Sequence, residues 1–186
     1  MKKIALIIVL LMAAVVSSQA QDKTTIYRMV LKAVQEFDQL EVSGDVTVEC
    51  RYNPEKAGFI VYHYNKGAGK KIDCRNDGRC LYVSGQSENN GVMTRIVVFY
   101  DQPIKRIVNN GDARVLSLRL VADDQKIELI NNGSGDMRFG VVKTQNAYME
   151  VAGSGNIAVK RVKIDDVETK ITGKGQVILK DKSLAE

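Results

Sequence analysis

The stretch that decides the fold is Gly133-Ser134-Gly135-Asp136-Met137. It returns as Gly153-Ser154-Gly155-Asn156-Ile157 and again as Gly173-Lys174-Gly175-Gln176-Val177, at intervals of 20 residues. Apolar residues recur at every second position on both sides of each Gly-x-Gly. Because side chains alternate between the two faces of a strand, this pattern predicts two short strands joined by a tight turn.

Residues that flank the three copies also align with one another. Ile127, Ala147 and Val167 each lie eight residues before the second glycine of their copy. A unit of this size cannot bury its own apolar face, so we expect the copies to stack in register. The sequence therefore predicts an all-β, single-domain parallel β-helix (a solenoid) with rungs of about 20 residues and Gly-x-Gly corners. An antiparallel sandwich is the competing arrangement, but it requires neither the even spacing nor the repeated corner.

The corner pattern has degenerate copies earlier in the chain, at Asn110-Gly111-Asp112-Ala113 and Ser43-Gly44-Asp45-Val46. Glycine is expected at a corner where the backbone conformation or a close contact opposes a Cβ. The predicted structural corner glycines are Gly44, Gly111, Gly133, Gly135, Gly153, Gly155, Gly173 and Gly175. The polar residues predicted to form a ladder along the corner are Asp112, Asp136, Asn156 and Gln176.

The remaining segments also favour β structure. Residues 38–50 read as two alternating strands around a Gly-Asp turn, and residues 58–64, 80–84 and 92–100 are rich in β-branched and aromatic side chains. Residues 24–36 fit either a short amphipathic helix or a strand. We favour the strand because everything that follows is β.

The N-terminus has the pattern of a secretory signal. Lys2 and Lys3 precede an apolar run over residues 4–16, and Ser17-Ser18-Gln19-Ala20 resembles a cleavage site. The run is shorter than the roughly 20 residues that span a bilayer. We therefore expect a signal peptide at 1–20, a lead-in segment at 21–36 and the solenoid domain at 37–182. The expected location is the periplasm, the cell surface or the extracellular space, and the exported chain is not expected to span a membrane.

Export would permit one disulfide among Cys50, Cys74 and Cys80. Residues 72–83 read as a hairpin with Asp77-Gly78 in its turn. A three-residue loop would place Cys74 opposite Cys80. A two-residue loop would instead turn Cys74 toward the core and Cys50, and the spacing does not decide between them.

Composition excludes several functions. Only 6% of the 186 residues are aromatic and there is one histidine, which argues against a base-stacking surface and against a metal site with several histidines. Loss of residues 1–20 removes two lysines and no acid, which lowers the formal net charge from +5 to +3. The remaining lysines and arginines are mixed with acids along the sequence, so we expect no nucleic-acid partner, and no cofactor or metal.

Other candidate sites have simpler interpretations. Residues 66–71 lack the glycine and the Ser/Thr of a phosphate loop, and His63 alternates with tyrosines in a predicted strand. Calcium would require charged oxygens, whereas the corner residue changes from Asp136 to an amide in the later copies. The acid pairs Asp123-Asp124 and Asp165-Asp166 are expected to lie in solvated turns between rungs.

The sequence resembles the bacterial family of putative auto-transporter adhesins, head GIN domain. Residues 37–48 match an F-D-x-[IL]-x-V-S-G-x-[ILV]-x-V opening, residues 78–83 match a G-x-L-x-[IV] strand interrupted by Cys80, and residues 133–137 and 153–157 match its serial S-G-[AS]-G-[DN]-[ILV] rungs. The resemblance covers roughly residues 37–180. It implies a single-domain parallel β-solenoid at the cell envelope and brings no motif of catalytic residues. The Gly111 corner lacks a second glycine, and the later rungs of longer members are missing.

Together these features predict a non-enzymatic, exported binding module for a surface protein or a polysaccharide. One alternative is a polysaccharide-active β-helix enzyme. Another is a structural periplasmic module that assembles through the ends of the solenoid, where an exposed last rung would be an open strand edge.

Overall fold

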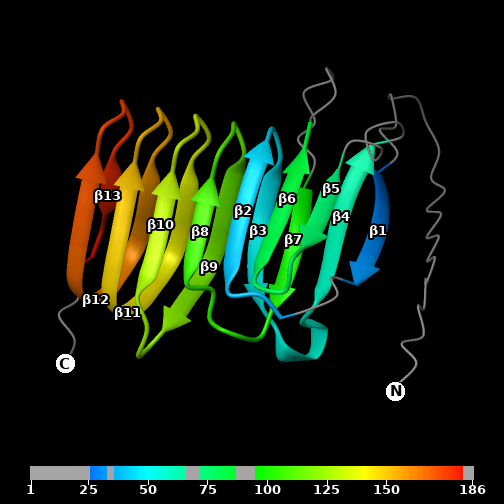
Figure 1. Cartoon of the computed structure of the whole chain (residues 1–186), viewed down its shortest axis with the longest axis horizontal. Coiled ribbons are helices and arrows are strands. Elements are labelled where there is room, and N and C mark those ends of the chain that lie inside the picture. Colours follow the sequence, from blue (N-terminus) through cyan, green and yellow to red (C-terminus); the bar gives the residue numbers. More distant parts are fainter. Residues whose placement is uncertain (1–25, 33–35, 66–71, 87–94, 182–186) are drawn as a thin grey trace, which may run out of the picture.

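The computed structural model describes residues 26–32, 36–65, 72–86 and 95–181, which form one sheet of 13 strands (Figure 1). The strands are β1 (Ile26–Lys32), β2 (Gln39–Gly44), β3 (Thr47–Tyr52), β4 (Phe59–Asn65), β5 (Asp73–Asn76), β6 (Cys80–Gly85), β7 (Arg95–Tyr100), β8 (Arg106–Asn109), β9 (Arg114–Ala122), β10 (Ile127–Asn131), β11 (Met137–Val151), β12 (Ile157–Ile171) and β13 (Val177–Leu179). A 3-10 turn, η1 (Pro54–Lys56), follows β3. In the described residues the predicted all-β class is confirmed, and the segment near residue 30 is a strand.

Most neighbouring strands run parallel. The antiparallel pairs are β1 with β4, β4 with β7, and β5 with β6. Met137 of β11 aligns with Ile157 of β12, which aligns with Val177 of β13. Ala147 likewise aligns with Ile127 and Val167. These are the positions that the sequence repeat superposes.

The sheet folds back on itself through the long strands β11 and β12. The first half of β11 pairs with β9, whereas its second half pairs with β10. Figure 1 shows the strands in two layers along the long axis, with β12 and β13 at one end and β1 and β4 at the other. One layer contains β7, β3 and β9, and the other contains β6, β2, β8 and β10.

The first strand pair does not lie at an end of the stack. β2 pairs with β6 on one side and β8 on the other, and β3 pairs with β7 and β9. The chain leaves this pair through β4 and β5, returns as β6 and β7, and then crosses it to begin β8. Order along the chain and order in space therefore differ at this point.

The core lies between the two layers. Its fully buried side chains come from inward positions of successive strands, including Leu40, Leu81, Ile96, Ile107, Leu129, Met137, Met149 and Ile157. Burying each large aliphatic side chain contributes about 1.5–3 kcal/mol, so the alternation seen in the sequence is what holds the layers together. The core becomes open to solvent at the second half of β12, where Ile171 is 51% exposed although its neighbour Val151 on β11 is fully buried. No helix among the described residues has the length and apolarity needed to cross a membrane.

Candidate functional site

The predicted corner glycines form two columns in the structure. An added Cβ at Gly153 would overlap the carbonyl oxygen of Gly133, and one at Gly173 would overlap that of Gly153. The same column continues through Gly111, Gly44 and the unpredicted Gly85.

The second column contains Gly135, Gly155 and Gly175, and it continues into Ala113. Ala113 thus occupies the place of the missing second glycine and is fully buried. Among the predicted glycines only Gly44, with φ of 81°, has a positive φ. At the other positions close approach of the neighbouring backbone, rather than φ, opposes a side chain.

Three of the four predicted ladder residues contact one another. The backbone N–H of Asn156 donates to Asp136 Oδ1 at 3.0 Å, and the backbone N–H of Gln176 donates to Asn156 Oδ1 at 3.0 Å. Asp112 instead accepts from the hydroxyl of Ser134. The hydrogen bond from the Asn156 backbone lowers the pKa of Asp136, and Arg138 at 2.8 Å lowers it further. The ladder therefore satisfies backbone N–H groups at the corner.

A buried asparagine pair was missed in the sequence. Asn109 and Asn131 are fully buried, and Asn109 Nδ2 donates to Asn131 Oδ1 at 3.1 Å. Asn131 Nδ2 also donates to the carbonyl of Gly135 at 2.8 Å, while its Oδ1 accepts from Gly133 N at 3.3 Å. A buried polar group without such partners would be costly, so these side chains fix the path of the turn. The signal in the sequence is the repeated Asn-Asn-Gly.

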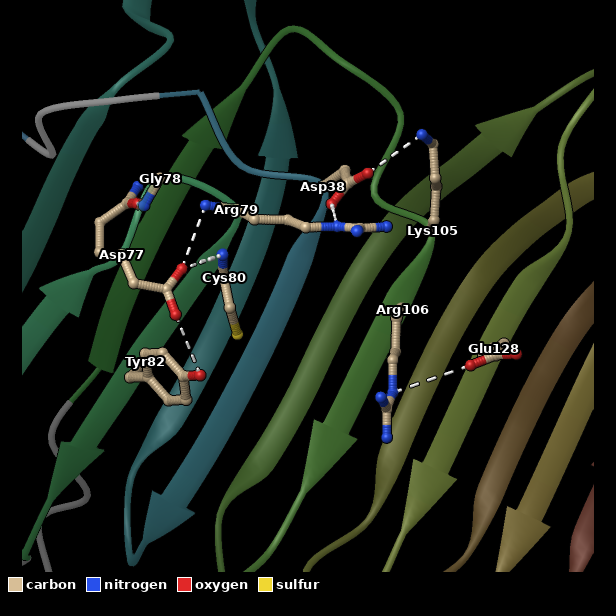
Figure 2. Close-up of polar contacts among 10 residues, drawn as sticks. Asp38, Asp77, Gly78, Arg79, Cys80, Tyr82, Lys105, Arg106 and Glu128 are labelled. Carbon is tan, nitrogen blue, oxygen red and sulfur yellow. Dashed lines mark hydrogen bonds and ion pairs between the residues drawn. The ribbon is translucent and has the colours of Figure 1, made fainter.

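Asp38 holds the point where the chain crosses its first strand pair, as Figure 2 shows. Its carboxylate accepts from Lys105 Nζ at 3.0 Å and from Arg79 Nε at 3.3 Å, and its carbonyl accepts from Lys105 N at 2.7 Å. Burial opposes ionisation, but Lys105 and Arg79 outweigh it and lower the pKa of Asp38. The Phe37-Asp38 opening is thus structural, since Phe37 is buried in the core.

Asp77 organises the turn of the β5–β6 hairpin (Figure 2). Its Oδ1 accepts from Cys80 N at 2.8 Å and from Arg79 N at 3.1 Å. The hairpin was predicted, but both proposed loops were wrong because Asn76 pairs with Leu81 and the turn centres on Gly78-Arg79. Gly78 has φ of 96°, which explains a glycine there.

The hairpin register separates the cysteines. Cys74 pairs with Val83 and packs against the core, whereas Cys80 lies beside Gln39 on the other side of the sheet. The structure has Cys50, Cys74 and Cys80 as free thiols, in place of the expected bridge. Burial raises the pKa of Cys50 and of Cys74 to about 12, so neither is an activated nucleophile.

Two hollows lie on the described surface. One, of about 330 Å³, is lined by Tyr52, Tyr100, Asp101, Pro103, Arg119, Val121 and Asp123. The rings of Tyr52 and Tyr100 pack edge to face with their centroids 5.8 Å apart, and the Tyr100 hydroxyl donates to the Arg119 carbonyl at 2.7 Å. A more polar hollow of about 240 Å³ is lined by residues of β2, β5 and β6, among them Glu41, Asp73, Arg75 and Tyr82.

The other candidates from the sequence do not converge on these hollows as a reactive cluster. Asp123 lies in a turn, as expected, and forms an ion pair with Lys143 at 2.6 Å. Asp165 and Asp166 lie within strand β12, so their assignment to a turn was wrong. His63 belongs to β4, and residues 66–71 lie outside the described residues. Within the described ranges no group of three or more His, Cys, Asp or Glu side chains could hold a metal ion.

The geometry defines a class of protein: a repeat-built, mostly parallel sheet with close-packed glycine columns and two broad outer faces. The chain belongs to the family described as "Putative auto-transporter adhesin, head GIN domain", which matches residues 36–184.

Solved structures match this chain at low sequence identity, and the one with a TM-score above 0.5 shows a similar fold. The structure described as a putative adhesin from Parabacteroides merdae is 14% identical, with a TM-score of 0.52 over 84% of this chain and 82% of that one. A structure described as a putative lipid binding protein from Parabacteroides distasonis is 12% identical, with a TM-score of 0.49 over 86% of this chain and 98% of that one. No curated protein matches the sequence.

Proposed function

We propose that this chain is an exported, non-enzymatic binding module of the bacterial cell envelope, built as a β-solenoid whose outer faces hold a surface protein or a polysaccharide. The observation that carries the proposal is the adhesin family match over residues 36–184. Export is supported by the secretory pattern of residues 1–20, which lie outside the described residues.

The solenoid interpretation rests on the register of the C-terminal strands. A 20-residue offset links Met137, Ile157 and Val177, and glycine backbones stack at the corners between them. Such a stack presents strands about 4.7–4.9 Å apart on each outer face. A flat, rigid array of side chains suits binding along an extended partner, and it positions side chains more firmly than a loop does.

The test is retention of purified residues 21–186 on bacterial envelope fractions and on a panel of glycans. Specific retention by the folded chain supports the proposal, and its absence across the panel overturns it. The same samples are assayed for soluble products from acidic polysaccharides. Release that is abolished by Asp123→Asn or Asp165→Asn would establish the enzyme in place of the binding module.

Self-assembly is a second candidate, favoured by the exposed end of the stack. The second half of β12 pairs with β11, its other edge has no strand partner in the described part of the chain, and Ile171 is 51% exposed there. Such an edge can pair with another chain. Sedimentation across a range of concentrations tests this, because a monomer at every concentration excludes assembly through this edge.

A further inference from the structure

The two outer faces differ in charge, which the linear sequence hides. We define the basic face as the outward side chains of β3, β7, β9, the first halves of β11 and β12, and β13, with the corner and end residues in line with them. The cations on its strands and at the end of β13 are Arg51, Arg95, Arg114, Arg119, Arg138, Lys143, Lys160, Arg161, Lys163 and Lys180. Within the described residues its acids are Glu49, Asp136 and, at the end of β9, Asp123.

The opposite face, formed by outward side chains of β5, β6, β2, β8, β10 and the second halves of β11 and β12, has the reverse balance. Its described acids are Glu41, Asp73, Glu128, Glu150 and Glu168. Its cations already have partners. Lys170 lies 2.8 Å from Glu150, Arg106 lies 3.8 Å from Glu128, and Arg75 lies over the ring of Tyr82 at 4.9 Å.

Six of these ten cations on the basic face have no such partner. Glu49 accepts from both Arg51 and Arg95, and Asp136 accepts from Arg138. Lys143 forms an ion pair with Asp123 at 2.6 Å. The other six cations have no carboxylate within 4.0 Å among the described residues; they are Arg114, Arg119, Lys160, Arg161, Lys163 and Lys180. This excess charge is available to an external anion.

The charges are close enough to act together. Val159 of β12 pairs with Leu179 of β13, and Lys160 and Lys180 are the next residues on these two segments. Lys180 N donates to the Val159 carbonyl at 2.9 Å. Neighbouring strands are about 4.7–4.9 Å apart, whereas the screening length at physiological salt is about 8 Å. The potentials of the neighbouring Lys160 and Lys180 therefore add.

The remaining side chains on this face narrow the class of ligand. Leu118, 78% exposed, is its one large exposed apolar side chain among the described residues, which is too little to anchor a protein in a bilayer. Phe99 is covered by Lys56, whose Nζ lies 5.8 Å from the ring centre, so this ring is not free to stack on a base. A row of cations on a flat surface suits an extended polyanion.

We propose that the basic face binds an acidic polysaccharide along the axis of the stack, through Arg114, Lys160 and Lys180. This inference rests on the proposed binding function and names its ligand class. The ligand's carboxylates or sulfates would pair with the unpartnered cations, and the binding would weaken with salt because bound counterions are released.

The test compares two triple variants of residues 21–186 with equal loss of charge. Arg114→Gln/Lys160→Gln/Lys180→Gln removes three unpartnered cations from the basic face. Arg106→Gln/Lys126→Gln/Lys170→Gln is the control on the opposite face, where Lys126 lies 3.9 Å from Glu128. Circular dichroism first checks that both variants are folded. The probes are polygalacturonate, dextran as a neutral polymer, and phosphatidylglycerol vesicles, each at low and high salt.

The expected result is salt-sensitive binding of the wild-type chain to polygalacturonate, with little affinity for dextran. The basic-face variant should lose at least about tenfold in affinity and the control less than about twofold. Equal losses in both variants would overturn the inference, since net charge alone would then explain binding. Stronger binding to the vesicles through the same three residues would also overturn it, in favour of a lipid surface.

Failure of this inference differs from failure of the proposed function. A wild-type chain that is retained on envelope fractions or neutral glycans but not on polygalacturonate refutes the acidic ligand and leaves the binding module. A chain that is retained on none of these refutes both.

Discussion

Replacing Gly155 by alanine tests whether the corner column holds the stack together. An ideal Cβ at Gly155 would lie closest to the Gly135 carbonyl oxygen and 2.7 Å from both the Gly135 carbonyl carbon and the Ser134 oxygen. Ordinary contact begins near 3.4 Å, and the obstructing atoms are backbone, which cannot rotate away. The two strand pairs must therefore separate locally.

The cost follows from what that separation breaks. Gly155 N and Ser154 N each donate to the Gly133 carbonyl at 3.1 Å, and both hydrogen bonds would lengthen. Each is worth about 0.5–1.5 kcal/mol, and overpacking of a rigid site typically costs about 1–3 kcal/mol. We expect Gly155→Ala to lower the free energy of unfolding by about 2–4 kcal/mol, and Gly155→Val by more.

Urea unfolding of residues 21–186, followed by far-UV circular dichroism, measures this loss. Ser154→Ala is the matched control, because Ser154 is exposed in the same turn and should change stability by less than about 0.5 kcal/mol. A loss below about 0.5 kcal/mol for Gly155→Ala would refute the close-packing explanation of the glycine columns.

Three further predictions concern the polar and thiol groups. Asn131→Ala should cost about 2–3 kcal/mol in urea unfolding, since it strands the Gly133 N–H and removes the hydrogen bonds of Asn131 with Asn109 and with the Gly135 carbonyl. The same change at exposed Asn132 should be nearly neutral. Cys50 and Cys74, whose pKa values are raised to about 12 by burial, should resist a thiol reagent at pH 8 in the folded chain. After unfolding without reductant, all three cysteines should react. Reaction of a single cysteine would instead reveal a disulfide between the other two. Because the pKa of Asp136 is lowered in the folded chain, its contribution to stability is present above about pH 4 and is lost as the pH falls through the folded pKa. Asp136→Asn should therefore make the free energy of unfolding depend less on pH in this range. An unchanged pH profile would exclude the contribution.

The repeated sequence pattern was enough to predict much of the strand pairing in the C-terminal half of the chain. The spacing of Gly135, Gly155 and Gly175 predicts both a parallel pairing and its register, because a slip of one residue would turn every apolar side chain outward. The pairing of Met137 with Ile157 follows from that constraint. No comparable spacing exists before residue 110, where the repeat is interrupted by β4 and the β5–β6 hairpin.

The candidate sites were harder to predict because they depend on contacts across the stack. The role of Asp38 depends on Arg79 and Lys105, which are far away in the sequence and meet only where the chain crosses itself. The basic face depends on which alternate positions point outward and on which strands are neighbours, so cations that are mixed with acids along the chain are segregated in space. Composition records neither relationship.

The interior place of β2 and β3 has a consequence for secretion. In a chain exported from its N-terminus, as proposed above, this pair emerges directly after β1, yet it gains its flanking neighbours only when β6–β7 and then β8–β9 have emerged. Until residue 100 is outside, both borders of this pair are unsatisfied, and the border toward β8 and β9 stays open to misassociation until residue 122 has emerged. Enclosure of β2 and β3 is thereby tied to the passage of two thirds of the chain, and the salt bridges of Asp38 with Arg79 and Lys105 close only late in that process.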